Sequence, residues 1–306
     1  MIRHQQKECR MRPTEKRPST LLNGNGDRSA NAAAKRAVML IGHGSVRSGA
    51  GAAMIRLAKR VHQAGVAPIV RAGFLNYRRP TFAEALAHCA QDGAQDVIIQ
   101  PYFLVPGKFV SDDLQVLLEA GRATHPELDL YAAKPFGDHW ALAQLVLKRA
   151  IEADYMAANP HISKREIPRA LEDGADWQPT YAHKRTGLLL MAHGSPDPRA
   201  NEPIQGIAQR ARAHGRYAAV SVCFMDLNQP SIAEAIDALV ARGITTIIAV
   251  PYFLHMGNHV RDDLPAAIAG AHARHPACTI LLAEHLAYDQ LLVPVIADRV
   301  AEAVGS

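Results

Sequence analysis

The chain contains one unit written twice, and this duplication constrains its fold more than any other feature of the sequence. Gly42-His43-Gly44-Ser45 recurs 150 residues later as Ala192-His193-Gly194-Ser195. Pro101-Tyr102-Phe103-Leu104 recurs at the same offset as Pro251-Tyr252-Phe253-Leu254. The offset stays constant over about a hundred residues, which indicates a duplication without net insertion. Two copies of one fold are therefore expected.

Each copy alternates short apolar runs, which predict strands, with stretches of helical periodicity. In the first copy the expected strands are 38–42, 69–75, 96–104 and 128–133, and the expected helices are 52–63, 81–91, 112–124 and 139–153. Thr81 and Glu84 form a capping-box pattern at the start of the second helix. The second copy repeats this order from a strand at 187–192 to a helix near 290–303. The pattern predicts an α/β fold of two tandem-duplicated, doubly wound, flavodoxin-like domains, each a four-stranded parallel sheet with helices on both faces.

These patterns divide the chain into four parts. Residues 1–36 hold nine Lys and Arg against three Asp and Glu and show little periodicity, so we expect a disordered basic tail. Residues 37–153 form the expected N-terminal domain, 154–186 a connector and 187–306 the C-terminal domain. Trp177 and Tyr181 indicate that the connector packs against a domain instead of forming a free linker.

The composition indicates a soluble globular protein, with 48% hydrophobic and 21% charged residues and a net charge of +5. No apolar run reaches the roughly 18 residues that a membrane span needs, and the basic N-terminus lacks the apolar segment of a signal peptide. The four cysteines are scattered and form no CxxC, so we expect reduced thiols in a cytoplasmic protein. The chain has no GxxxxGK[ST] phosphate loop, which favours an ATP-independent reaction.

Three side chains of the second copy are expected to meet beyond the carboxyl ends of its strands. His193 follows the first strand of that copy, Asp226 follows the second, and His259 lies in the loop after the third. Open parallel sheets bind ligands at this edge. Two imidazoles and a carboxylate suit a borderline divalent ion such as Co(II), Fe(II), Ni(II) or Zn(II) and leave coordination positions open. The alternatives are that each histidine hydrogen-bonds within a tight turn and that Asp226 orients a loop.

The first copy lacks part of this set. It retains His43, but Asn76 stands where the second copy has Asp226, and Phe109 stands where the second has His259. A phenylalanine cannot bind a metal ion. The comparison predicts one working site in the C-terminal domain and a degenerate site in the N-terminal domain.

The order of these motifs resembles a known family. The runs 192–201 and 224–231, followed by 251–254 and Gly257-Asn258-His259-Val260, are similar to sirohydrochlorin chelatases of the CbiX/SirB type. The resemblance extends over roughly residues 37–150 and 187–303. These proteins are class II chelatases that place Co²⁺, or Fe²⁺ in some members, into sirohydrochlorin during cobalamin or sirohaem synthesis.

The resemblance implies the chelatase fold and an ATP-independent insertion in which the divalent metal is a substrate and no organic cofactor takes part. It implies that His193 and His259 bind the metal and are catalytic, with His193 as the chief base. Asp226 stands where the family often has a glutamate that also meets the metal.

The resemblance also implies a set of substrate contacts. Sirohydrochlorin carries eight carboxylates, and the cleft between the copies is the natural place for a flat macrocycle. The residues expected to contact it are His43, Lys108, Arg199, Tyr252, His255, Asn258 and Arg261. The expected partners are this tetrapyrrole and the metal ion, with neither nucleic acid nor membrane, and the expected form is a pseudo-dimeric monomer.

Three other functions stay open at this point. A non-catalytic carrier of metal or tetrapyrrole would use the same residues. A chelatase for another tetrapyrrole would differ in its carboxylate contacts. A periplasmic-type ligand-binding protein would also have two α/β lobes, although the absence of a signal-peptide pattern counts against it.

Overall fold

The computed structural model describes residues 35–44, 51–107, 113–163, 166–167, 183–255, 257, 259–286 and 288–305, with the backbone alone at 183, 198, 259 and 260. The predictions for residues 1–34 and for Trp177 and Tyr181 lie outside the described residues. Arg36, which we expected in the tail, is the first residue of a strand.

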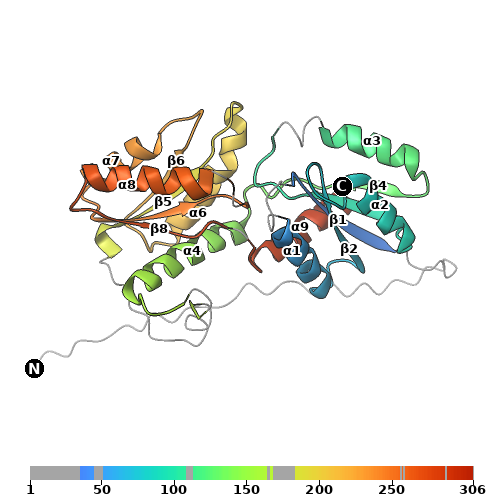
Figure 1. Cartoon of the computed structure of the whole chain (residues 1–306), viewed down its shortest axis with the longest axis horizontal. Helices are drawn as coiled ribbons and strands as arrows, with labels where there is room; N and C mark the ends of the chain where they lie inside the picture. The colour runs from blue at the N-terminus through green and yellow to red at the C-terminus, as the bar shows by residue number, and fades with distance from the viewer. Residues whose placement is uncertain are drawn as a thin grey trace, which may run out of the picture. The chain divides into compact units, whose positions relative to one another are not determined.

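The first copy forms a four-stranded parallel sheet with the strand order β2-β1-β3-β4. Its strands are β1 (Arg36–Gly42), β2 (Ile69–Phe74), β3 (Asp96–Pro101) and β4 (Asp129–Ala132). Its helices are α1 (Ala52–Gln63), α2 (Phe82–Gln91), α3 (Leu114–Thr124) and α4 (Trp140–Ala158). The predicted capping box of Thr81 and Glu84 is present at the start of α2. The sheet with α1, α2 and α3 is called the first lobe below (Figure 1).

The second copy forms a second parallel sheet with the equivalent order β6-β5-β7-β8. Its strands are β5 (Thr186–Ala192), β6 (Ala219–Phe224), β7 (Thr246–Pro251) and β8 (Thr279–Leu282). Its helices are α6 (Glu202–Ala213), α7 (Ile232–Ala241), α8 (Leu264–Arg274) and α9 (Leu292–Val304). Short 3₁₀ turns η2 (His183–Arg185) and η3 (Pro198–Asn201) precede β5 and α6, and a π-helical turn η4 (His259–Asp263) precedes α8. The sheet with α6, α7 and α8 is the second lobe.

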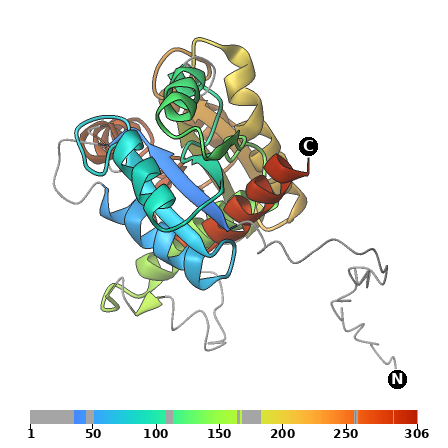
Figure 2. The ribbon, with the colours of Figure 1, turned by 90° about the vertical axis from the view of Figure 1, so that its right-hand side faces the viewer.

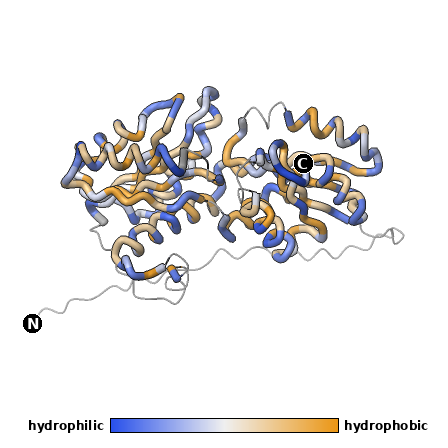
Figure 3. Tube along the Cα trace, in the orientation of Figure 1, coloured by the Kyte–Doolittle hydropathy of each residue, from blue (hydrophilic) through white to orange (hydrophobic). Residues whose placement is uncertain are grey.

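Alternate residues of each strand face different cores because side chains alternate across a sheet. In β1, Val38 and Leu40 face a core that the two lobes share, whereas Met39 and Ile41 face α2 and α3. The second sheet is arranged in the same way, with its outer core under α7 and α8. The strands are accordingly hydrophobic along most of their length, as buried parallel strands must be (Figure 3).

The last helix of each copy packs against the other copy's sheet. Helix α4 contacts α6, β7 and β8 of the second lobe, although the sequence places it in the first copy. Helix α9 contacts α1, β3 and β4 of the first lobe. Figure 1 shows the green α4 under the second sheet and the red α9 beside the blue α1, and Figure 2 shows α9 against the first lobe from another side. The two copies therefore exchange their terminal helices.

Two arginines separated by the repeat offset fix this exchange. Arg149 in α4 donates from Nε to the carbonyl oxygen of His285 (2.9 Å) and from Nη2 to that of Leu286 (3.0 Å). Arg299 in α9 donates to the carbonyl oxygens of Pro135 (3.1 Å) and Phe136 (2.7 Å), the equivalent loop of the first copy. Each guanidinium thus joins a helix of one copy to a loop of the other.

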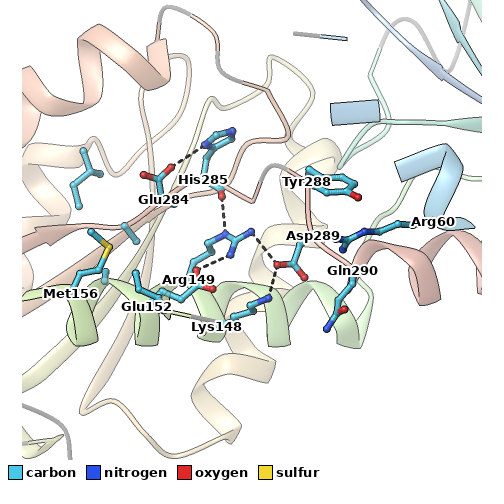
Figure 4. Close-up of a pocket in the computed structure, with 14 residues that line it drawn as sticks. Arg60, Lys148, Arg149, Glu152, Met156, Glu284, His285, Tyr288, Asp289 and Gln290 are labelled. Atoms are coloured by element: carbon cyan, nitrogen blue, oxygen red, sulfur yellow. Dashed lines mark hydrogen bonds and ion pairs between the residues drawn. The ribbon is translucent and has the colours of Figure 1, made fainter. Parts of the chain in front are cut away.

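Arg149 is more deeply buried than its counterpart and also pairs with acidic groups. Its Nη2 lies 3.1 Å from Oδ2 of Asp289, and its Nη1 lies 2.7 Å from Oε2 of Glu152. Lys148 reaches the same Asp289 oxygen at 2.7 Å (Figure 4). These groups line a pocket of about 500 Å³, but their charges are already paired with one another.

The turns that follow β1 and β5 bring the main chain of neighbouring strand ends into contact. The N–H of Asp226 donates to the carbonyl oxygen of His193 (3.1 Å), and the N–H of Asn76 donates to that of His43 (3.0 Å). Gly194 adopts φ +95°, and a Cβ there would lie 2.3 Å from the carbonyl oxygen of Asp226. Only glycine fits such a position, which explains why both copies carry the His-Gly pair.

The observed elements agree with the predicted ones except at their ends. Strand β3 ends at Pro101 instead of continuing to residue 104, although the N–H of Tyr102 still donates to the carbonyl oxygen of Ile41 (2.8 Å) and its side chain is buried in the core. Helix α4 runs to Ala158 and so extends into the expected connector. None of the described helices is both long and apolar enough to cross a bilayer.

Replacing Arg149 by Met should lower the free energy of unfolding by about 3–5 kcal/mol, because it removes one partner of a buried charge network and leaves Lys148 and the N–H of Leu291 as the partners of Asp289. Arg299→Met is the matched control, since Arg299 makes the equivalent carbonyl contacts, and its loss should cost about 1–3 kcal/mol. Urea unfolding followed by circular dichroism measures both. Equal losses would show that the pairing with Asp289 contributes nothing further.

Replacing Gly194 by Ala should destabilise the protein by at least about 1–2 kcal/mol, the cost of a left-handed backbone for a residue with a Cβ, and should displace the Asp226 turn. Gly257→Ala is the control, because a Cβ there meets no atom within 4 Å. It should change stability by less than about 0.5 kcal/mol. Thermal unfolding of the two variants side by side tests this, and an unaffected Gly194→Ala protein would contradict it.

Candidate functional site

The strand order places the expected site residues of the second copy at adjacent strand ends. β5 lies between β6 and β7 in the sheet. His193 directly follows β5, and Asp226 lies two residues beyond the end of β6. Because all strands run parallel, these two positions lie at the carboxyl edge of the sheet, where α/β proteins bind ligands.

His193 and Asp226 face each other at this edge. Nε2 of His193 lies 3.9 Å from Oδ2 of Asp226, and their side chains are 47% and 53% exposed. One divalent ion with bonds of about 2.0–2.2 Å to imidazole nitrogen and carboxylate oxygen can span these two atoms. The exposure of both side chains leaves further coordination positions to water or to an incoming ligand.

His259 lies at the start of η4, the turn that precedes α8. Its side chain lies outside the described atoms, so its place in the metal set stays a prediction. Within the described ranges, no group of three His, Cys, Asp or Glu side chains is gathered closely enough to hold a metal ion. The pair of His193 and Asp226 is therefore the part of the expected set that the structure describes.

A cavity of about 580 Å³ lies beside His193 and is lined by both lobes. The first lobe contributes His43 and residues 102–105, and the second contributes His193, residues of η3 and α6, and residues 252–255 and 257. Most of these side chains are aromatic or aliphatic, and the polar ones include three imidazoles, those of His43, His193 and His255. Such a cavity suits a flat, largely apolar ring whose centre requires nitrogen ligands or bases.

His43 and His255 are held in the neutral form. The loss of hydration lowers the pKa of His43, and the charge of Asp113 offsets part of this effect. His255 has surface open to the cavity, yet the surrounding protein removes enough of its hydration to lower its pKa to about 4, and His43 and His285 add to this effect. At neutral pH an unprotonated nitrogen of each ring has a lone pair.

His255 contacts the first lobe across the cavity. Its ring packs edge-on against Tyr102, with the ring centroids 5.4 Å apart, and the ring of His43 packs against Phe103 at 4.9 Å. Tyr102 and its repeat counterpart Tyr252 are buried, and their hydroxyl groups have no hydrogen-bond partner within the described part of the chain. The sequence analysis assigned Tyr252 to the site but missed Tyr102 and Phe103, although their repeated Pro-Tyr-Phe-Leu motif was a signal for both copies.

The cationic residues expected at the substrate are not gathered in the cavity. Arg199 is exposed and is not among the residues that line the cavity, although the next residue, Ala200, is, and it pairs with Asp197, two residues away, at 3.1 Å. Arg261 is exposed in η4 and is not among the residues that line the cavity. Lys108 and Asn258 lie outside the described residues. The contacts that we expected from these four residues therefore stay predictions.

The equivalent edge of the first copy carries different chemistry. His43 follows β1 as His193 follows β5, but the residue facing it is Asn76, whose side chain is exposed and carries no charge. Phe109 lies outside the described residues. The carboxylate that accompanies the histidine is thus present in the second copy and replaced in the first.

Known proteins resemble this chain in sequence. A family model described as CbiX matches residues 37–153 and again 187–303. A sirohydrochlorin cobaltochelatase of Priestia megaterium is 22% identical over 267 residues, covering 87% of this chain and 79% of that protein. A sirohydrochlorin ferrochelatase of the same organism is 22% identical over 274 residues, covering 88% of this chain and 91% of that protein.

The fold is also that of a solved structure, SirB from Bacillus subtilis with Fe³⁺. The two superpose with a TM-score of 0.71 at 20% sequence identity, over 88% of this chain and 95% of that one. At this identity the likeness concerns the fold, two parallel sheets with helices. Because the CbiX model matches both copies and so more than half of the chain, the protein belongs to the CbiX family.

Proposed function

We propose that this protein inserts a divalent metal ion, Co²⁺ or Fe²⁺, into sirohydrochlorin without using ATP. The observation that carries the proposal is the facing pair of His193 and Asp226 beside a cavity that both lobes line. The names of the relatives support the substrate, since one is a cobaltochelatase and the other a ferrochelatase of sirohydrochlorin.

The cavity supports the binding of a flat macrocycle. Its walls are the aromatic and aliphatic side chains that follow β3 and β7 together with residues of α6, which suit the faces of a conjugated ring. Arg199, which follows Asp197 by two residues and precedes the lining residue Ala200, can meet a carboxylate of the substrate if it leaves Asp197. Breaking this ion pair costs little free energy, because exposed ion pairs contribute little stability. Lys108, Asn258 and Arg261 complete the proposed contacts.

The metal ion is a substrate in this proposal. His193 and Asp226 hold it at the carboxyl edge of β5 and β6, with His259 as the third ligand. Asp226 is one methylene shorter than glutamate, and its 3.9 Å separation from His193 is within the span of a shared ion. As the pyrrole nitrogens replace the water ligands of the ion, they lose two protons, and neutral imidazoles are the bases at hand.

The residues do not distinguish cobalt from iron, because an imidazole and carboxylate site accepts both and cellular availability selects between them. We propose Co²⁺ as the physiological metal and cobalamin synthesis as the pathway, with Fe²⁺ and sirohaem synthesis as the alternative. The measurement that decides between the metals is the insertion rate with each ion at equal free concentration.

An anaerobic insertion assay with sirohydrochlorin tests the activity directly. We expect Co²⁺ and Fe²⁺ to be inserted faster than in the absence of protein, as followed by the change in the tetrapyrrole absorption spectrum. A tetrapyrrole with fewer carboxylates should react more slowly. Binding of metal or tetrapyrrole without faster insertion would identify a carrier and would refute the proposal.

His193→Ala should reduce the insertion rate at least about 10²-fold, because it removes a metal ligand at the reacting centre. His43→Ala is the matched control at the equivalent position of the first copy, and its loss should be smaller. Both proteins should unfold at similar temperatures, since both side chains lie at exposed strand ends. Equal losses of activity would contradict the assignment of a single working site to the second copy.

The affinity for Co²⁺ should fall as the pH is lowered, because protons compete with the ion for the imidazole lone pairs. The sign is fixed, since metal binding releases protons and acid must oppose it. Titration of the protein with Co²⁺ at several pH values, followed by visible absorption, measures this. An affinity that rises or stays constant toward acid would show that imidazoles are not ligands.

A further inference from the structure

Insertion makes two demands on histidine that a single imidazole cannot meet together. A neutral imidazole has one nitrogen with a lone pair and one nitrogen that carries a proton. When the lone pair is donated to a metal ion, it cannot accept a proton at the same time. If His193 and His259 hold the metal, as the proposed function requires, the two pyrrole protons need another acceptor.

Asp226 and His43 are less suited to this task than His255. Asp226 faces His193 at 3.9 Å, so it belongs with the metal ligands, and it does not line the cavity. His43 lines the cavity, but its ring packs against Phe103 and the carboxylate of Asp113 acts on it. His43 also makes a further interaction, in addition to those with Phe103 and Asp113.

His255 is a third imidazole of the cavity, and among the described residues it does not form a group of three potential ligands with His193 and Asp226. It lies in the loop after β7 and packs edge-on against Tyr102 of the first lobe, so that residues of both copies meet at this wall of the cavity. Neither of its ring nitrogens has a hydrogen-bond partner within the described ranges. The ring has surface open to the cavity, where the macrocycle is proposed to bind.

The repeat shows that this imidazole is not needed for the fold. The equivalent residue of the first copy is Val105, which lines the same cavity. Both loops follow equivalent strands, β3 and β7, so a valine supports the same backbone at this point of the loop. The imidazole is present only in the copy that also carries the aspartate facing its strand-end histidine.

We propose, on the basis of the proposed function, that His255 accepts the pyrrole protons during metal insertion, so that the base and the metal ligands are different side chains. The pyrrole N–H bond breaks as the bond from that nitrogen to the metal forms. The proton moves to the unprotonated ring nitrogen of His255, and the nitrogen electron pair becomes the donor to the metal. His255 then passes the proton to water and accepts the second one, so two protons leave for each divalent ion and no electron is transferred.

The surroundings of His255 suit acceptance followed by release. Its ring packs against Tyr102, while His43 and His285 disfavour its charged form, and no carboxylate in the described part of the chain acts on it strongly enough to keep it protonated. The polyanionic substrate raises the proton affinity of a nearby imidazole, because negative charge favours the protonated form. Because the ring has surface open to the cavity, the first proton passes to water before the second is accepted. When the product leaves, the effect of its negative charge ends and the second proton is lost to solvent as well.

The test uses the full chain with the variants His255→Ala and His255→Gln. Both should lower kcat for insertion about 10²-fold, the usual contribution of a general base. The dissociation constant for Co²⁺ and the KM for sirohydrochlorin should change less than about twofold, because neither is set by the proton acceptor. The wild-type protein in the same assay reports on the proposed function.

Added imidazole should restore the rate of His255→Ala, which leaves space for a small base, but not that of His255→Gln, which fills the space. Substituted imidazoles at equal free-base concentration should restore it in the order of their pKa values, with free Co²⁺ held constant by a metal buffer. This dependence on base strength separates proton transfer from a purely structural role.

Each other outcome overturns the inference in a recognisable way. A parallel loss of Co²⁺ affinity would make His255 a metal ligand, and a rise in the KM for sirohydrochlorin alone would make it a substrate contact. A His255→Ala protein of full activity, or one that no base restores, would exclude it as the acceptor. An inactive wild-type protein would refute the proposed function itself. An active wild-type protein with an equally active His255→Ala variant would refute only the role of His255 and would leave the proposed function intact.

Discussion

The exchange of α4 and α9 is the constraint on which the rest of the structure depends. Each helix buries its apolar side chains in a core that the two lobes share, and each anchors a buried guanidinium on the loop of the other copy. Separating the copies would expose that core and leave Arg149 among unpaired groups, which is costly in a poorly hydrated environment. Neither copy therefore has a complete core by itself. The contacts that complete the core also bring the carboxyl edges of the two sheets together, so that both line one cavity.

This shared framework allows the two copies to differ in chemistry without differing in shape. His43 and His193 leave equivalent strands through equivalent turns, and both contribute to the cavity. Asp226 faces His193, whereas Asn76 stands at the matching place, and His255 stands where the first copy has Val105. The first lobe thus contributes wall residues such as Tyr102 to the cavity, while the second lobe contributes the imidazole of His255 and the facing pair of His193 and Asp226, which we propose as metal ligands.

The sequence predicted the sheets and helices well because hydrophobic periodicity reports which side of an element is apolar. It does not report which sheet that side will meet, so the exchange of α4 could not be predicted from the repeat. Arg199 shows a similar limit, since a charged side chain near a strand end looks available until the structure shows that Asp197 engages it. His255 was predicted as a contact to the substrate, and only the placement of its ring in the cavity beside Tyr102 suggests a base. The metal-binding role of His259 stays a prediction.

The repeat also shows which parts of the motif serve the backbone and which serve chemistry. Gly44 and Gly194 both have positive φ, and at both places a Cβ would collide with the carbonyl oxygen of the next strand's turn. This steric demand acts on both copies alike, whether or not a site is present, and so it preserves the His-Gly turn in each. The side chains at 76 and 226, or at 105 and 255, meet no such demand, because the backbone is the same with either residue. The backbone requires no difference between the copies at such a position, and it is there that the carboxylate facing His193 and the additional imidazole of His255 are found. We infer that these differences serve the proposed chemistry.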